Sequence, residues 1–217
     1  MKTCPLCVAA VAGLSIAGVA FVAGQLTAGT SPAPLAATTA VTPKAAAPSA
    51  KAGFTVDVVH STAIFGIKHK GVAYNYGRFD KLAGSFNIDA SKPEASSIEV
   101  TIDTDSINTA NVKRDSHLKS GDFFSVKEFP KATFKSKSFK KTGEGKYEVS
   151  GDLTIRGQTK PLTATVEDTG RAAGDKGELA GVRSMFTFKR SDFGMSYMVG
   201  TGLADEVEMI VSLEGGK

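Results

Sequence analysis

The amino-acid sequence predicts an all-β fold: an eight-stranded antiparallel barrel with one short helical segment, preceded by an apolar N-terminal segment and a linker. Three observations predict it. From residue 53 onward, short runs alternate apolar and polar residues, turn-forming residues separate the runs, and helical periodicity is almost absent. A closed barrel is favoured over an open sheet because closure removes unpaired strand edges.

Residues 1–52 differ in composition from the rest of the chain. They contain no aspartate or glutamate and only three lysines. Within them, residues 6–23 form an uncharged run of 18 residues, which is long for a secretory signal and at the lower limit for a membrane-spanning helix. We therefore expect residues 1–24 to be a signal peptide or a membrane anchor, with the small residues Ala23, Gly24 and Ala28 favouring cleavage.

Both cysteines, Cys4 and Cys7, precede this apolar run, so the folded domain uses neither disulfides nor thiol chemistry. Residues 25–52 are rich in Ala, Pro and Thr and cannot bury enough apolar surface to fold. They are therefore expected to be a linker. Residues 53–217 are sufficient for one domain and too few for two of ordinary size.

The alternation in this domain is clearest in residues 85–89, 98–103, 162–167 and 207–213. In residues 98–103, for example, Ile98, Val100 and Ile102 alternate with polar residues. Successive side chains of a strand face opposite sides, so each run has one apolar and one solvated face. Turn-forming residues at 91–93, 142–145, 157–161 and 174–177 separate the runs. Residues 111–120 are the exception and favour a short helical turn.

A net charge of +4 and a pI of about 9.0 are compatible with a nucleic-acid-binding protein. The basic residues are scattered and interleaved with acids, and the densest cluster, residues 131–141, alternates Lys with Phe as a strand with a wet face does. No nucleic-acid partner is expected. The mild basicity instead favours transient contact with an anionic membrane surface.

Several motifs resemble the YceI-like, polyisoprenoid-binding domains, whose fold is a lipocalin-like barrel. The matching segments run in order through residues 53–214, and they are Phe-Thr-Val-Asp at 54–57, His-Ser at 60–61, His69, Gly-Arg-Phe at 77–79, and the stretches 84–89, 106–109, 114–124, 129–136, 151–161, 192–194 and 205–207. The resemblance implies an exported cell-envelope protein, periplasmic or secreted, that holds an isoprenoid or quinone-like lipid within the barrel. An uncleaved N-terminal segment would tether it to the inner membrane.

An eight-stranded barrel is just wide enough to be packed solid or to hold one small ligand, and the sequence leaves both open. If a lumen exists, its aliphatic and Phe lining would select a long hydrocarbon over a sugar or nucleotide. Strand parity and the family resemblance together predict these lumen residues: Phe65, Ile67, Phe79, Phe86, Ile88, Val100, Phe134, Leu153, Ile155, Phe186, Phe188 and Met209.

The most concentrated polar motif consists of Arg114, Asp115 and His117. We hypothesise that Arg114 and Asp115 pair with barrel groups and pin the short helix over one opening; the alternative is that they only cap and orient the helix. His60, His69 and His117 are the only histidines, and no two have the spacing of a metal site, so no metal is expected.

No G-x-S-x-G, P-loop or H-E-x-x-H motif is present, so neither an enzyme nor a cofactor other than the lipid is expected. The prediction is a protein for carriage, storage or stress protection. Two alternatives remain open: an enzyme acting on a small apolar substrate, with Arg114, Asp115 or His117 as acid or base, and a solid-core interaction module. The sequence does not fix the oligomeric state, and a dimer is compatible with it.

Overall fold

A computed structural model describes residues 53–217 of the protein. The predicted signal or anchor at 1–24, the linker at 25–52 and both cysteines lie outside the described residues. Within residues 53–217, no helix has the length and apolar character needed to cross a membrane.

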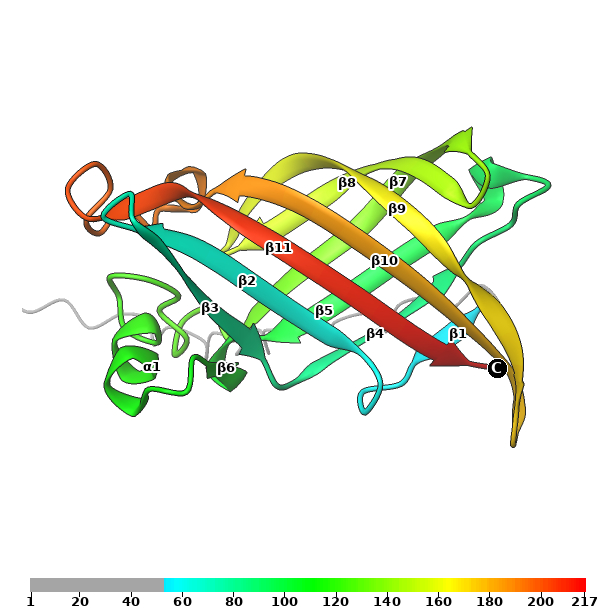
Figure 1. Cartoon of the computed structure of the whole chain (residues 1–217), viewed down its shortest axis with the longest axis horizontal. Coiled ribbons are helices and arrows are strands. Elements are labelled where there is room, and N and C mark those ends of the chain that lie inside the picture. Colours follow the sequence, from blue (N-terminus) through cyan, green and yellow to red (C-terminus); the bar gives the residue numbers. More distant parts are fainter. Residues whose placement is uncertain (1–52) are drawn as a thin grey trace, which may run out of the picture. The chain divides into compact units, whose positions relative to one another are not determined.

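Antiparallel β-strands make up most of the described chain (Figure 1). One seven-residue α-helix and three short 3-10 turns complete it. The strands are β1 (Phe54–Val56), β2 (Thr62–His69), β3 (Ala73–Phe79), β4 (Leu82–Asn87), β5 (Ser97–Asp103), β6 (Ile107–Asn108), β7 (Lys131–Gly143), β8 (Lys146–Ile155), β9 (Gln158–Gly174), β10 (Gly177–Lys189) and β11 (Leu203–Gly216); the helix is α1 (Val112–Leu118), and the turns are η1 (Pro93–Ala95), η2 (Thr104–Ser106) and η3 (Arg190–Phe193).

Eight strands form a closed ring, which confirms the predicted barrel. Their order is β1-β4-β5-β7-β8-β9-β10-β11, and β1 pairs with β11 to close the ring. Three further strands extend from β11 in the order β2-β3-β6. The barrel is therefore closed at the β1 end, whereas β2 and β3 continue its wall toward the other end.

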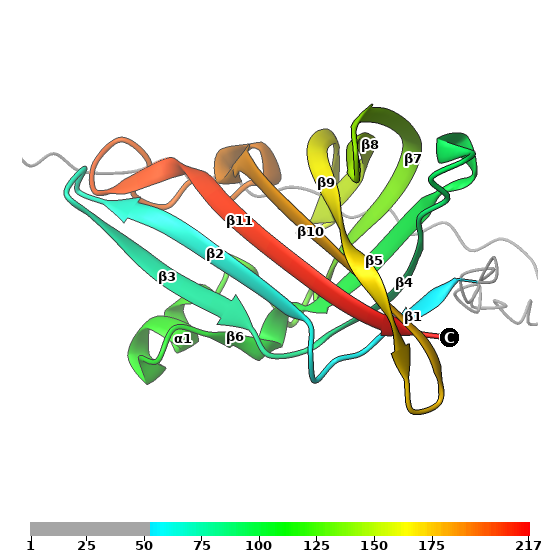
Figure 2. The same ribbon diagram turned by 45° about the vertical axis from the view of Figure 1, so that its right-hand side comes forward.

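Strands β1 and β2 share one neighbour because the chain bends between them. Thr55 and Val56 pair with the last residues of β11, and β2 pairs with the rest of that strand from Ser212 back to Leu203. Residues 57–61 form the bend. Both ribbon views show β2 running beside β11 while β1 meets its C-terminal end (Figure 1, Figure 2).

The end of the barrel at β1 is filled by aromatic side chains. Phe54 and Phe86 are register partners on β1 and β4, and their rings stack with centroids 5.6 Å apart. Gly215 on β11 makes this approach feasible, because a Cβ there would lie 2.9 Å from the Phe86 ring and 2.8 Å from Phe54 Cβ. These contacts plug one end of the barrel.

Helix α1 lies at the other end, near β3 and β6 (Figure 2). Its N-cap is Asn111, whose side-chain oxygen accepts a hydrogen bond from the Arg114 backbone N–H at 3.0 Å. Asn strongly favours this position, and here it ends the extended stretch after β6. The predicted short helix in residues 111–120 is thereby confirmed.

Candidate ligand cavity

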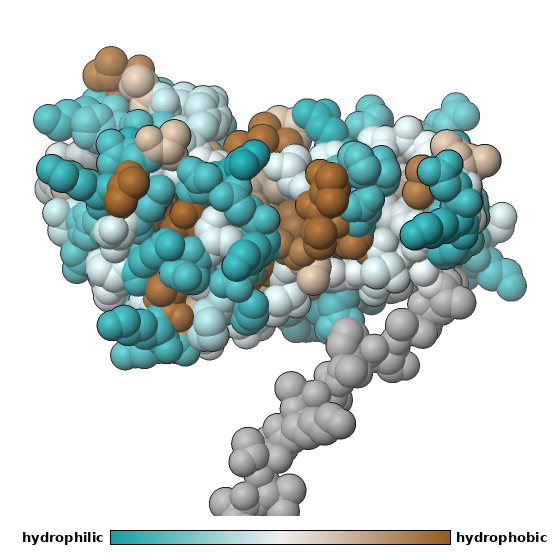
Figure 3. Space-filling model, turned by 90° about the horizontal axis from the view of Figure 1, so that it is seen from below, coloured by the Kyte–Doolittle hydropathy of each residue, from teal (hydrophilic) through white to brown (hydrophobic). Residues whose placement is uncertain are grey.

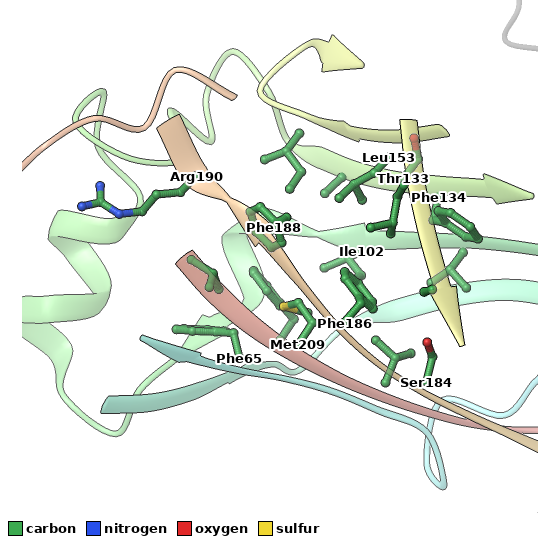
Figure 4. Close-up of a pocket in the computed structure, with 18 of the residues that line it drawn as sticks. Phe65, Ile102, Thr133, Phe134, Leu153, Ser184, Phe186, Phe188, Arg190 and Met209 are labelled. Carbon is green, nitrogen blue, oxygen red and sulfur yellow. The ribbon is translucent and has the colours of Figure 1, made fainter. Parts of the chain in front are cut away.

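A cavity occupies the interior of the barrel. Its volume is about 160 Å³, taken as the space open to the centre of a water molecule. About 10–15 Å³ on that measure holds one water, so the barrel is hollow rather than packed solid. Figure 4 shows aromatic and aliphatic side chains from several strands converging on this space.

The lining follows from strand alternation. On β11, Val207, Met209, Val211 and Leu213 point inward, while on β10 the inward positions include Phe186 and Phe188. The same period-two rule places Leu162, Ala164 and Val166 of β9 on the inner face. The strands that line the cavity thus contribute mainly alternate side chains to a largely apolar wall.

The structure places ten of the twelve predicted lumen residues in the cavity wall. These are Phe65, Ile67, Phe79, Val100, Phe134, Leu153, Ile155, Phe186, Phe188 and Met209. The other two, Phe86 and Ile88, are buried but lie outside the cavity. Their parity is inward, yet they belong to the plugged end, where Phe86 is stacked on Phe54 and has no open space beside it.

Besides Arg190 of η3, four apolar cavity residues come from outside the strands. Leu118 belongs to α1, Phe123 and Phe124 follow it, and Met195 follows η3. Their segments carry no period-two pattern, so strand parity gives no signal for them. Leu162, Ala164 and Val166 carry the pattern, and the alternation at 162–167 was the signal that could have identified them.

These residues form a cover over the α1 end of the cavity. Phe124 donates its backbone N–H to the Leu118 carbonyl at 3.0 Å, and its ring meets Phe79 of β3 edge-on at 5.6 Å. The cover is therefore fastened to the barrel wall by aromatic packing.

Arg114 and Asp115 anchor α1 through one residue, Thr109. Asp115 Oδ1 accepts hydrogen bonds from the N–H and the hydroxyl of Thr109. Arg114 donates to the hydroxyl and carbonyl of Thr109, and more weakly to Asn75 Oδ1 of β3 at 3.4 Å. Helix α1 is thus tied to β3 and to the segment that follows β6.

His117 connects α1 to the loop between η3 and β11. Its Nε2 lies 2.8 Å from Asp122 Oδ2, and its ring packs edge-on against Phe123 and Tyr197 with centroids 5.1 and 4.9 Å away. His117 does not line the cavity. Its contacts are those of a residue that holds two surface segments together.

Arg190 is a buried cation at the α1 end of the cavity. Only 2% of the residue is exposed, and burial lowers the pKa of its guanidinium. Three backbone carbonyls accept its hydrogen bonds, those of Met195 (2.6 Å), Ala204 (2.9 Å) and Leu203 (3.4 Å). In Figure 4 its guanidinium points away from the apolar side chains. The charge therefore stabilises the loop between η3 and β11 and does not face the lumen.

The cavity offers little acid–base chemistry. Besides Arg190, its polar wall residues are Thr133, Arg183 and Ser184, and the Ser184 hydroxyl donates to the Thr165 carbonyl at 2.8 Å. Among residues 53–217, no carboxylate, histidine or cysteine lines it. A bound molecule would therefore meet hydrocarbon surface and few hydrogen-bonding groups.

The histidines occupy separate elements: His60 in the β1–β2 bend, His69 at the end of β2 and His117 in α1. In the described part of the chain, one cluster has three candidate metal-ligating side chains, and it contains a single histidine, His60, with Asp57 and Glu214. The spacing of histidines in the sequence gave no sign of this cluster. Glu214 comes from the last strand, β11, far from Asp57 and His60 in the sequence.

Comparisons with known proteins agree with this geometry. Residues 54–215 match the YceI-like domain. A UPF0312 protein of Pseudomonas aeruginosa is 40% identical over 159 residues, which cover 72% of this chain and 81% of that protein. Burkholderia cenocepacia BcnA is similar in structure, with a TM-score of 0.69, 26% identity and coverage of 74% of this chain and 99% of that one. A polyisoprenoid-binding domain from Saccharophagus degradans shares the fold, with a TM-score of 0.59, 16% identity and coverage of 76% and 99%.

Proposed function

Because the chain belongs to the YceI-like domain family, we propose that it is a carrier that binds a long isoprenoid or quinone-type lipid inside its barrel. The observation that carries this proposal is the apolar cavity enclosed by the barrel strands and covered by α1. The Saccharophagus degradans domain, which shares the fold, is described as polyisoprenoid-binding, and this supports the proposal.

The chemistry of the wall supports a hydrocarbon ligand. Each CH₂ group that leaves water contributes about 0.8 kcal/mol, so a prenyl chain gains free energy along its whole length without hydrogen bonds. A sugar or nucleotide would lose its hydrogen bonds to water and regain few from Thr133 and Ser184. The cavity therefore favours apolar ligands over polar ones.

Two rival functions are less well supported. An enzyme with Arg114, Asp115 or His117 as acid or base would need one of them at the bound molecule, whereas all three are engaged outside the cavity wall. A solid-core interaction module would need a filled barrel, and this one is hollow. Binding without catalysis is the function that this geometry favours.

We also propose that the lipid enters at the α1 end. Three segments meet there: α1, the β2–β3 turn and the loop from η3 to β11. The Lys70 backbone N–H donates to the Gly202 carbonyl at 2.8 Å, and His117 contacts Tyr197. The opposite end is plugged by Phe54 and Phe86.

The same end carries the features of a membrane-docking surface. Val72, Val112, Tyr197 and Met198 are exposed on these segments, and Val112 has 82% of its surface in water. Lysines lie beside them at positions 68, 70 and 113. Apolar side chains among lysines favour transient contact with an anionic bilayer, consistent with a carrier of the cell envelope. Figure 3 shows a face of the molecule on which a group of apolar residues lies near the middle, flanked by polar ones.

Mass spectrometry of organic extracts tests the proposal, using protein purified from its own host without detergent. We expect one isoprenoid or quinone per chain. An empty protein that also takes up no added prenyl lipid would contradict the proposal and restore the interaction module.

A matched pair of variants ties the lipid to the cavity. Ala164→Trp fills space inside the barrel, whereas Thr165→Trp places the same ring on the outer face of β9. We expect Ala164→Trp to lose lipid uptake and Thr165→Trp to keep it. Equal uptake by both folded variants would place the lipid elsewhere.

A further inference from the structure

Three side chains that can bind a metal ion lie close together at the bend between β1 and β2. We propose that Asp57, His60 and Glu214 bind a divalent transition-metal ion of the Zn²⁺ class there. This proposal is independent of the lipid cavity. It rests on the side chains that the bend brings against the C-terminal strand.

The backbone fixes the positions of these side chains. The Asp57 N–H donates to the Glu214 carbonyl at 2.8 Å, and the Glu214 N–H donates to Ser61 Oγ at 3.0 Å. The Ser61 hydroxyl in turn reaches the Glu214 carbonyl at 3.2 Å. The bend is thereby fastened to Glu214 on both sides, so a metal would not have to gather its ligands from mobile segments.

The distances between ligand atoms suit a small cation. His60 Nδ1 lies 2.8 Å from Asp57 Oδ2 and 3.6 Å from Glu214 Oε1, and all three atoms lie within 4.8 Å of one another. Nitrogen and oxygen ligands sit about 2.0–2.2 Å from Zn²⁺. Two such ligands are separated by about 2.9 Å at a right angle and about 3.4 Å at the tetrahedral angle. The two distances from His60 Nδ1 are close to these values.

The remaining coordination is open to water. Asp57 Oδ1 is used by the Val59 N–H at 2.8 Å, which leaves Oδ2 for the metal. The side chains of His60, Asp57 and Glu214 keep 61%, 36% and 38% of their surface exposed. Three protein ligands with accessible further positions are the arrangement of an open zinc site, in contrast to the four-ligand arrangement of a structural one.

The ligand set selects the class of ion. One imidazole nitrogen with two carboxylates favours Zn²⁺, Co²⁺ or Ni²⁺, whereas Mg²⁺ and Ca²⁺ prefer oxygen ligands alone. A bound ion would crosslink residues 57–61 to β11, next to the Phe54 plug. It would therefore stabilise the closed end of the barrel without entering the cavity.

The test is zinc titration of the full chain in which Cys4→Ser and Cys7→Ser remove the only thiols. Isothermal titration calorimetry and elemental analysis after gel filtration should find one Zn²⁺ per chain. His60→Ala and Glu214→Gln should lose this binding, and His69→Ala, which removes a histidine elsewhere, should retain it. Excess Mg²⁺ should not displace the zinc.

Thermal unfolding gives a second measurement, because a ligand that binds only the folded state raises Tm. Zn²⁺ should raise Tm in the parent and in His69→Ala, and leave it unchanged in His60→Ala. No stoichiometric binding by the parent, or equal binding by the His60→Ala and Glu214→Gln variants with native circular dichroism, would overturn the proposal.

Discussion

The guanidinium of Arg114 donates two hydrogen bonds to Thr109, one from Nε to the hydroxyl and one from Nη2 to the carbonyl, each 2.8 Å long. Thr109 is buried and also donates to Asp115. One buried threonine with two charged partners therefore makes most of the side-chain hydrogen bonds that hold the cover helix in place.

Arg114→Ala should loosen this link. The variant leaves the Thr109 carbonyl without its charged donor, which costs about 1–3 kcal/mol for a buried group. We expect lower stability in urea unfolding and faster amide hydrogen exchange in residues 109–126. Lys113→Ala, on the exposed side of the same helix, is the control, and equal effects of the two variants would refute the anchoring role.

Phe86 and Phe134 should respond differently to substitution. Phe86→Ala removes a ring from the plugged end and should cost about 3–5 kcal/mol of stability.

Phe134 lines the cavity, so Phe134→Asp should abolish prenyl-lipid uptake by placing a charge in the lumen. Chemical unfolding and lipid uptake by native mass spectrometry measure the two effects; uptake unchanged in folded Phe134→Asp would remove this residue from the site.

Arg190→Met should release the loop between η3 and β11. The side chain keeps its apolar bulk but loses donors to three carbonyls, so the expected cost is about 1–3 kcal/mol. Lys140→Met, at an exposed position of β7 outside the cavity wall, should have little effect. Hydrogen exchange should rise at residues 194–204 in the first variant alone; unchanged exchange there would contradict the role of Arg190.

Asp103 should make stability depend on pH in the acid range. The hydrogen bond from Lys131 lowers the pKa of Asp103 below its ordinary value of 3.8. A lowered folded pKa means that the stabilising effect is present above pH 3.8 and is lost as pH falls through the folded pKa. Since Lys131 is half exposed, the effect should be about 0.5 kcal/mol.

Asp103→Asn measures this contribution, since the amide oxygen still accepts from the Asp105 N–H while the charge is gone. The stability difference between parent and variant should be constant from pH 7 to pH 5 and shrink toward pH 3. A difference that persists at pH 2 would show that the ion pair is not its source.

Val112→Glu tests the docking surface. It places a negative charge on the α1 end, so loading from anionic vesicles should slow, whereas binding of lipid already dispersed in solution should not change. Met185→Glu, exposed on the outer face of β10, is the matched control. Equal slowing by the two variants would place the contact elsewhere.

The barrel could be predicted from the sequence because strand alternation is a local property. Ile98 and Val100 share a face whatever their neighbours are, since successive side chains of a strand point to opposite sides. Together with the family resemblance, the same rule predicted Phe65, Phe186 and Met209 as lumen residues, and the structure places them in the cavity wall. The short helical turn predicted in residues 111–120 likewise depends on neighbouring residues alone.

Tertiary structure decided what lies between the strands. Parity makes Phe86 face inward just as Phe134 does, but only the ring closure at β1, β4 and β11 turns Phe86 into a plug and leaves space beside Phe134. Whether inward side chains fill a barrel depends on the size of the closed ring, which no single strand encodes. The cluster of Asp57, His60 and Glu214 depends in the same way on pairing between the first and last strands, where Ser61 and Glu214 meet across 153 residues of chain.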